Sequence, residues 1–256
     1  MNRSEENGTI TENMSNENLK KEEKTLLFYA SAAPLSDPEL FLKAYSSVSA
    51  GRREKCDRFR FDRDKRLCLG AGVLLNYALG FFRCSPSSRE IVTGENGKPF
   101  FRDKGIFFNL SHSGDFVLCA VSTREVGCDI EQVRGIDLNI ARRFFFGSEY
   151  DDILSRPTDR EKTEMFFRYW TLKESFMKAT GKGMSLPLDS FSVTPGDPVG
   201  LSQTFDRRKY DLREFSCIPG YRCAVCSVVP DSGTTEISDP RQVELEAVLS
   251  GNTKRE

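Results

Sequence analysis

Two carboxylates, Asp129 and Glu131, have the type and spacing that most directly suggest chemistry. They follow Gly127 in an apolar segment typical of a strand, and residues two apart on a strand point to the same face. Carboxylates held side by side repel each other unless a cation lies between them. Ligands that are all oxygens suit magnesium or calcium rather than zinc. The pair therefore suggests a magnesium or calcium site, although two ordinary surface acids at a strand end would give the same pattern.

A third carboxylate, Glu174, lies in a segment with strong helical periodicity, residues 159–180. Apolar residues recur there at steps of four and three and predict one buried face: Met165, Tyr169, Leu172, Phe176 and Ala179. Glu174 lies opposite that face, and Lys178 follows one turn later. By itself this spacing favours a surface ion pair. If Glu174 faced Asp129 and Glu131, it would complete the metal site and leave Lys178 available for a phosphate.

The segment Ser111-His112-Ser113-Gly114 follows an apolar run and places two hydroxyls and an imidazole before a glycine. The Gly-x-Ser-x-Gly pattern of a nucleophile elbow does not occur, and the chain has one histidine. A catalytic triad and a histidine-rich metal site are therefore poor interpretations. Phosphate binding in a tight turn suits these side chains better, and a structural histidine suits them about equally well.

Basic residues are concentrated between Arg52 and Arg66, where they outnumber the acidic ones. Such a segment is either a solvated helix face or part of a site for a polyphosphate ligand such as a nucleotide. Lys98 follows the turn-forming pair Asn96-Gly97 and is a candidate of the same kind.

The elements that must position these residues alternate between strands and single helices, which predicts an α+β or α/β architecture. Capping signals favour helices that begin at Asp37-Pro38 and at Thr158, the latter with Glu161 three residues on. Ser36 and Glu39 give a second capping-box pattern. The remaining expected elements are strands over 26–33, 107–110, 116–122 and 128–131, helices near 67–79, 137–146 and 241–249, and a hairpin of 211–218 and 221–229.

Composition excludes several classes of function. A net charge of −1 gives no basic excess for nucleic acid, and the longest apolar run, residues 67–82, is short for the roughly 20 residues of a membrane span. No secretory signal opens the chain, which favours the cytoplasm, and the polar residues 1–24 are expected to be a disordered tail. The eight cysteines are expected to be small core residues. Cys223 and Cys226 should point to opposite faces of one strand, which argues against zinc.

Four motifs occur in one order and together resemble a known enzyme family. They are GKP at 97–99, FNLSHSG at 108–114, GCDIE at 127–131 and WTLKESFMK at 170–178. This set resembles the larger, two-lobed class of 4′-phosphopantetheinyl transferases, the type that activates peptide and polyketide synthetases. REKC at 53–56, GKG at 181–183 and LPL at 186–188 extend the similarity over about residues 26–230.

The resemblance implies two similar lobes related by a pseudo-twofold axis, each a small sheet packed with a long helix, with coenzyme A in the cleft between them. The expected division is a tail over 1–24, lobes over 25–123 and 124–236, and a mostly flexible tail over 237–256. Such an enzyme transfers 4′-phosphopantetheine from coenzyme A to a serine hydroxyl of an acyl or peptidyl carrier protein. It releases adenosine 3′,5′-bisphosphate, and a cytoplasmic monomer without nucleic-acid or membrane partners is expected.

The resemblance also implies roles for individual residues. Asp129, Glu131 and Glu174 would hold Mg²⁺, for which Mn²⁺ is a substitute, and Glu174 or a metal-bound water would be the base. Lys178 would contact the pyrophosphate and help the nucleotide leave. The coenzyme A nucleotide would be bound by the remaining candidates: Arg52, Arg66, Lys98, Pro99, Ser111 and His112. Leu67 departs from the pattern, because relatives often carry a hydroxyl there.

Two other functions agree less well with the sequence. A coenzyme A or nucleotide sensor would need cations for binding rather than three acids. A two-carboxylate hydrolase such as a glycosidase would place its acids on either side of a scissile bond, whereas Asp129 and Glu131 should lie side by side on one strand.

Overall fold

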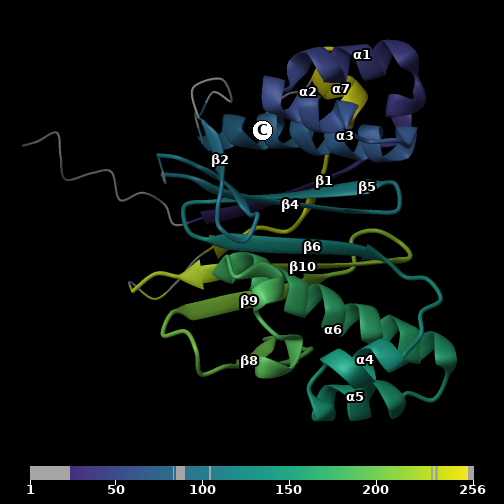
Figure 1. Cartoon of the computed structure of the whole chain (residues 1–256), viewed down its shortest axis with the longest axis vertical. Coiled ribbons are helices and arrows are strands. Elements are labelled where there is room, and N and C mark those ends of the chain that lie inside the picture. The colour runs from purple at the N-terminus through teal and green to yellow at the C-terminus, as the bar shows by residue number, and fades with distance from the viewer. Residues whose placement is uncertain are drawn as a thin grey trace, which may run out of the picture.

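The first half of the chain forms a sheet that is covered by helices on one face (Figure 1). The computed structural model describes residues 24–82, 84, 90–103, 105–231, 233 and 236–252, so the predicted tail over 1–24 lies outside the described residues except for Lys24. The sheet has the order β11-β1-β5-β4, with β12 also paired to β1. Its long strands are antiparallel: β1 (Lys24–Ser31), β5 (Phe116–Ser122) and β4 (Phe107–Ser113). The covering helices are α1 (Pro38–Ser47), α2 (Ala50–Asp57) and α3 (Asp62–Leu79).

The second half forms a smaller antiparallel sheet with its own long helix. The strand order is β6-β10-β9, with β6 (Val126–Gln132), β10 (Tyr221–Val229) and β9 (Lys209–Phe215). The helix α6 (Asp159–Thr180) lies across this sheet, flanked by α4 (Asn139–Phe144) and α5 (Gly147–Leu154) (Figure 1). Two short hairpins complete the strands: β2 (Ile91–Thr93) with β3 (Pro99–Phe101), and β7 (Ser192–Thr194) with β8 (Gly200–Ser202).

Three hydrophobic cores lie between these layers. The first lies between α3 and the first sheet, the second between α6 and the second sheet, and the third between the two sheets. Cys226 belongs to the second core and Cys223 to the third, so the prediction that these thiols point to opposite faces of β10 is confirmed. None of the described helices is both long enough and apolar enough to cross a bilayer.

The helix ends follow the predicted capping signals with one exception. Thr158 and Glu161 form the expected capping box of α6, and Gly181 ends that helix with φ 74°, a left-handed conformation that glycine adopts readily. The N-cap of α1 is Asp37, whose carboxylate accepts hydrogen bonds from the N–H groups of Glu39 and Leu40. The predicted capping box between Ser36 and Glu39 is therefore wrong, because Asp37 occupies the N-cap position.

A buried ion pair fixes α6 to the elements around it. Lys173 Nζ lies 2.8 Å from Glu149 Oε2, and the two side chains are 0% and 2% exposed. The ammonium also donates to the carbonyls of Leu188 and Phe191, both at 2.8 Å, and Glu149 Oε1 accepts from the N–H of Val193. Because Glu149 lies on α5 and the other partners lie in residues 188–193, the pair holds α5, α6 and that segment together.

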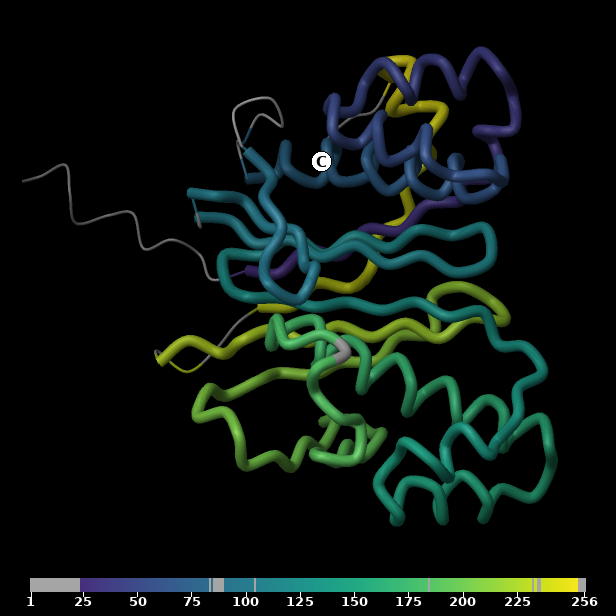
Figure 2. The backbone as a smooth tube through the Cα atoms, in the orientation of Figure 1, coloured from purple at the N-terminus to yellow at the C-terminus, as the bar shows by residue number. Residues whose placement is uncertain are grey.

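The C-terminal segment returns to the first sheet, and the tail predicted over 237–256 is wrong for the residues that the structure describes there. β11 (Glu236–Ile237) and β12 (Arg241–Gln242) pair in parallel with β1, and α7 (Leu245–Leu249) packs among the first helices. Figure 2 shows this yellow segment beside the purple N-terminal helices. Val243 and Leu245 are buried in the first core, so apolar burial orders the segment.

Candidate active site

Side chains join the edges of the two sheets along β4 and β6. Ser111 Oγ donates to Asp129 Oδ1 at 2.7 Å, and Ser113 Oγ donates to Glu131 Oε2 at 2.6 Å. Both pairs are separated by 18 positions in the sequence, so the two strands run in the same direction where they meet. Alternation along each strand thus directs two hydroxyls at two carboxylates, and confirms that Asp129 and Glu131 share a face.

The last turn of α6 brings an ammonium to this junction. Lys178 Nζ lies 2.6 Å from Asp129 Oδ1 and 3.2 Å from both Ser111 Oγ and the carbonyl of Cys128. Burial is the largest single influence and lowers the pKa of Lys178, but the charge and hydrogen bond of Asp129 and the charge of Glu174 act together against it, so the pKa is raised overall. Asp129 is 3% exposed, and its second oxygen, Oδ2, is buried without a hydrogen-bond partner.

Gly127 permits the close approach of α6 to β6. A Cβ atom at this position would lie 2.1 Å from the carbonyl oxygen of Ser175 and 2.4 Å from the nitrogen of Ala179. Both are backbone atoms of α6, so no side-chain rotation would relieve the contact. The absence of a side chain at Gly127 therefore lets the helix carry Glu174 and Lys178 to the strand that carries Asp129.

Glu174 and Glu131 lie within electrostatic reach of Asp129 and of each other. Burial is the main cause of a raised pKa at Glu174, and the charges of Asp129 and Glu131 add to it. Burial also raises the pKa of Glu131, and the charge of Asp129 adds to this while the hydrogen bond from Ser113 opposes it. Each of these carboxylates makes ionisation of the others less favourable, and a bound cation would stabilise their ionised forms.

The cluster has features of a cation site but is not a preformed one. Within the described part of the chain, no three histidine, cysteine or acidic side chains are gathered closely enough to hold a metal ion. The unpartnered Oδ2 of Asp129 and the raised pKa values of Glu131 and Glu174 are nevertheless what an oxygen-rich cation site requires. The donor set fits magnesium and does not fit zinc.

The candidate phosphate-binding residues flank this cluster on one side. His112 is exposed between the two serines, and partial desolvation, followed by the charge of Lys178, lowers its pKa. Arg52 on α2 and Arg66 on α3 are half-buried. The α3 end reaches the junction through Arg63, whose Nε donates to the carbonyl of Gly114 at 3.2 Å.

Lys98 and Pro99 lie on the other side of the cluster, at the start of β3. Pro99 pairs with Thr93 across the short hairpin. Lys98 Nζ donates to the carbonyls of Val126 and Lys178 at 2.8 and 2.6 Å, so its partners in this structure are backbone groups. Burial lowers the pKa of Lys98 to about 8.

Sequence reasoning did not single out Ser113 as a site residue. Its hydroxyl both donates to Glu131 and accepts from the N–H of Gln132 at 3.1 Å. The strand was predicted to end at Leu110, whereas β4 continues to Ser113, and on this longer strand Ser113 shares a face with Ser111. Asn109, two residues before Ser111, continues the row: its Oδ1 accepts from the N–H of Cys128 at 2.8 Å.

Comparison with known proteins places both halves of the chain in one family. A family model described as "4'-phosphopantetheinyl transferase superfamily" matches residues 125–226, and one described as "4'-phosphopantetheinyl transferase, N-terminal" matches residues 35–124. Among solved structures, the holo-[acyl-carrier-protein] synthase of Thermotoga maritima aligns with 41% of this chain and 62% of its own at 21% identity. Its TM-score is 0.33, which is too low to support a statement about the fold.

Curated relatives match over most of their own length. The 4'-phosphopantetheinyl transferase Sfp of Bacillus subtilis is 39% identical over 190 residues, which are 73% of this chain and 84% of the relative. The corresponding protein psf-1 of Bacillus pumilus is 40% identical over 72% of this chain and 80% of the relative, and HetI of a Nostoc species is 37% identical over 66% and 75%. With both family models matched in sequence order, the chain belongs to the 4′-phosphopantetheinyl transferase family.

Proposed function

We propose that this chain transfers the 4′-phosphopantetheine group of coenzyme A to a serine hydroxyl of an acyl or peptidyl carrier protein, with release of adenosine 3′,5′-bisphosphate. The observation that carries the proposal is the meeting of Lys178 with Asp129 and Ser111, which come from α6, β6 and β4. Family membership gives the reaction, and this junction offers acids and an ammonium where the phosphoryl group would react.

Asp129, Glu131 and Glu174 are the residues that would hold Mg²⁺, and Mn²⁺ would be accepted in its place. The partnerless Oδ2 of Asp129 and the raised pKa values of the two glutamates support this assignment. When bound, the ion would neutralise charge on the pyrophosphate oxygens. Ser111 and Ser113 orient the carboxylates by donating to one oxygen of Asp129 and one of Glu131.

Lys178 would stabilise the negative charge that spreads over the phosphoryl oxygens during transfer. Its ammonium is held by Asp129 and Ser111, so it is oriented before substrate arrives. Glu174, directly or through a water, would accept the proton of the carrier serine, and its raised pKa brings it closer to the pH at which a base works best. The nucleophile belongs to the carrier, so the enzyme needs no activated serine or cysteine.

The remaining candidates would hold the nucleotide end of coenzyme A. Arg52, Arg66 and His112 offer charge or hydrogen bonds on the flank formed by α2, α3 and the end of β4. Lys98 and Pro99 are the candidates on the β3 flank. The two sheets with their long helices α3 and α6 would be the two lobes, over 25–123 and 124–236, related by a pseudo-twofold axis with the ligand between them. A cytoplasmic monomer without nucleic-acid or membrane partners completes the proposal.

A carrier-modification assay tests this function. The protein is incubated with coenzyme A, Mg²⁺ and an apo carrier protein, and the carrier is weighed by mass spectrometry. We expect the carrier to gain one phosphopantetheine. Carriers of both the acyl and the peptidyl type that remain unmodified would refute the transferase, and coenzyme A binding without transfer would favour a sensor.

Variants of the site make the assay specific. Asp129→Ala should abolish transfer while the fold is retained, because it removes the carboxylate shared by Lys178 and the proposed ion. Glu246→Ala, which removes an exposed carboxylate on α7, is the matched control and should retain full activity. Lys178→Ala should slow transfer more than it weakens coenzyme A binding. The opposite ranking would assign Lys178 to binding rather than to the reaction.

A further inference from the structure

The turn between β2 and β3 contacts the C-terminal end of α6. The turn spans residues 94–98 and is closed by backbone hydrogen bonds from Gly97 to Gly94 and from Gly94 to Lys98, both at 2.9 Å. Asn96 Nδ2 donates to the carbonyl of Gly181 at 3.0 Å, and Lys98 Nζ donates to that of Lys178 at 2.6 Å. Two side chains of one turn thus bind two carbonyls at one helix end.

Those carbonyls are groups that a helix leaves without internal partners. The last four C=O groups of an α-helix have no N–H above them, and a cation beside them is favoured by the helix dipole. The carbonyl of Lys178 also accepts a longer bond of 3.3 Å from the N–H of Gly181. The 94–98 turn therefore acts as a C-terminal cap that comes from another part of the chain.

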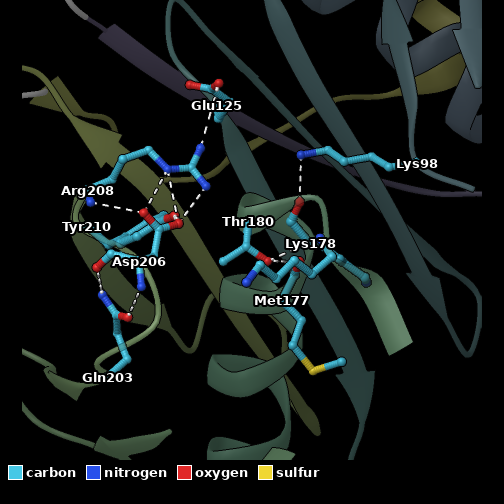
Figure 3. A network of polar contacts seen from close by, with 10 residues as sticks. Lys98, Glu125, Met177, Lys178, Thr180, Gln203, Asp206, Arg208 and Tyr210 are labelled. Carbon is cyan, nitrogen blue, oxygen red and sulfur yellow. Dashed lines mark hydrogen bonds and ion pairs between the residues drawn. The ribbon is translucent and has the colours of Figure 1, made fainter. Parts of the chain in front are cut away.

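Lys98 also joins the helix to the strand beside it. Its ammonium donates to the carbonyl of Val126 at 2.8 Å, directly before Gly127, where the backbones of α6 and β6 approach closely. One nitrogen therefore bridges the backbone of β6 and that of α6. Figure 3 shows this ammonium directed at the Lys178 carbonyl, while the Lys178 side chain extends away from it.

A second network holds the segment that leads into β6. Asp206 accepts from Arg208 and Tyr210 at 2.6 Å each, and Arg208 reaches Glu125 at 3.7 Å (Figure 3). Glu125 directly precedes β6. The carbonyl of Glu125 also accepts from the N–H of Val228 at 2.9 Å, and β6 pairs with β10, so the bridge from Lys98 joins the last turn of α6 to a strand held by backbone hydrogen bonds.

We propose that Asn96 and Lys98 are positioning residues, which cap α6 and fix the backbone of Lys178 against β6 so that its ammonium meets Asp129. The proposal rests on the proposed function of Lys178 and gives Lys98 a role other than direct contact with a phosphate. Burial of Lys98 beside backbone carbonyls supports it, because two of the three N–H donors of its ammonium are already used by carbonyls of the protein.

The cap itself is tested by hydrogen exchange, which needs no substrate. Lys98→Met and Asn96→Ala should raise the exchange rate of the amides in residues 177–181, relative to the rest of α6. Glu95→Ala, an exposed position on the same turn, is the control and should leave these rates unchanged. Wild-type exchange rates in both Asn96→Ala and Lys98→Met would overturn the cap. Asn96→Ala removes one exposed hydrogen bond, so it carries the test if Lys98→Met does not fold.

Kinetics distinguish positioning from phosphate binding. Lys98→Met should lower kcat by about tenfold to a hundredfold with little change in the KM for coenzyme A, because a small misplacement of a reacting group costs up to about that much. In a Lys178→Ala background the same substitution should have almost no further effect on kcat. A raised KM with unchanged kcat, or additive losses in the double variant, would overturn the positioning role. If the wild-type protein transfers nothing, the proposed function fails, while the exchange experiment still decides the cap.

Discussion

The contact between Gly127 and α6 leads to a quantitative prediction. In Gly127→Ala the new Cβ would lie 2.1 Å from the carbonyl oxygen of Ser175, and the backbone must move by about 1 Å to reach a contact of 3.0 Å. Overpacking of this kind costs about 1–3 kcal/mol, and the upper end is expected because both opposing atoms belong to the backbone. The same displacement would draw Lys178 away from Asp129, which lie 2.6 Å apart.

Urea unfolding measures this cost. With a slope of about 2 kcal/mol per molar urea, a loss of about 3 kcal/mol lowers the midpoint by about 1.5 M. The control is Gly51→Ala on α2, where a Cβ meets nothing within 4 Å and the substitution should instead stabilise by roughly 0.5–1 kcal/mol. Transfer activity should fall in Gly127→Ala below the unfolding temperature and stay normal in Gly51→Ala. A wild-type midpoint for Gly127→Ala would show that β6 and α6 are not in backbone contact there.

Three further predictions concern charge. Lys173→Met should cost about 3–5 kcal/mol in urea unfolding because it leaves Glu149 charged and buried; a double variant with Glu149→Gln should recover part of that loss, and equal losses would refute the pairing. Burial and mutual repulsion raise the pKa values of Glu131 and Glu174, so the folded protein holds protons that the unfolded chain releases above about pH 4.5. In metal-free buffer the Tm should therefore fall as the pH rises through these raised values, and Glu174→Gln should flatten the profile; a variant profile as steep as wild type would contradict this. At pH 7 Mg²⁺ should raise the Tm by offsetting the repulsion, and an equal rise in Asp129→Asn would exclude Asp129 as a ligand.

Short-range features of the site could be predicted from the sequence because they depend on local periodicity. The shared face of Asp129 and Glu131 follows from strand alternation, and the capping box at Thr158 follows from helix chemistry three residues apart. The opposite faces of Cys223 and Cys226 follow in the same way.

Long-range features could not be predicted, because one sequence does not show which distant groups meet. Lys173 is a charged residue beside Glu174 on α6, and its burial depends on Glu149, 24 positions earlier. In the sequence Lys98 has the pattern of an exposed cation after a turn, and its contact with the carbonyl of Lys178 in α6, 80 positions away, is not visible there. The pairing of β11 and β12 with β1 similarly depends on a contact across more than 200 positions, which two-residue strands do not signal.

The two carboxylate oxygens of Asp129 have different environments at the centre of the site. Oδ1 accepts from Ser111 and pairs with Lys178, whereas Oδ2 is buried and has no partner. A buried carboxylate oxygen without a hydrogen-bond partner destabilises the folded state. This oxygen lies where β6, β4 and α6 meet. The ammonium of Lys178 pairs with the carboxylate of Asp129. The carboxylates of Glu131 and Glu174 are still repelled by that of Asp129 and by each other. The lysine is therefore paired within the protein, and the repulsion among the remaining carboxylates can be relieved by a proton or by a bound cation.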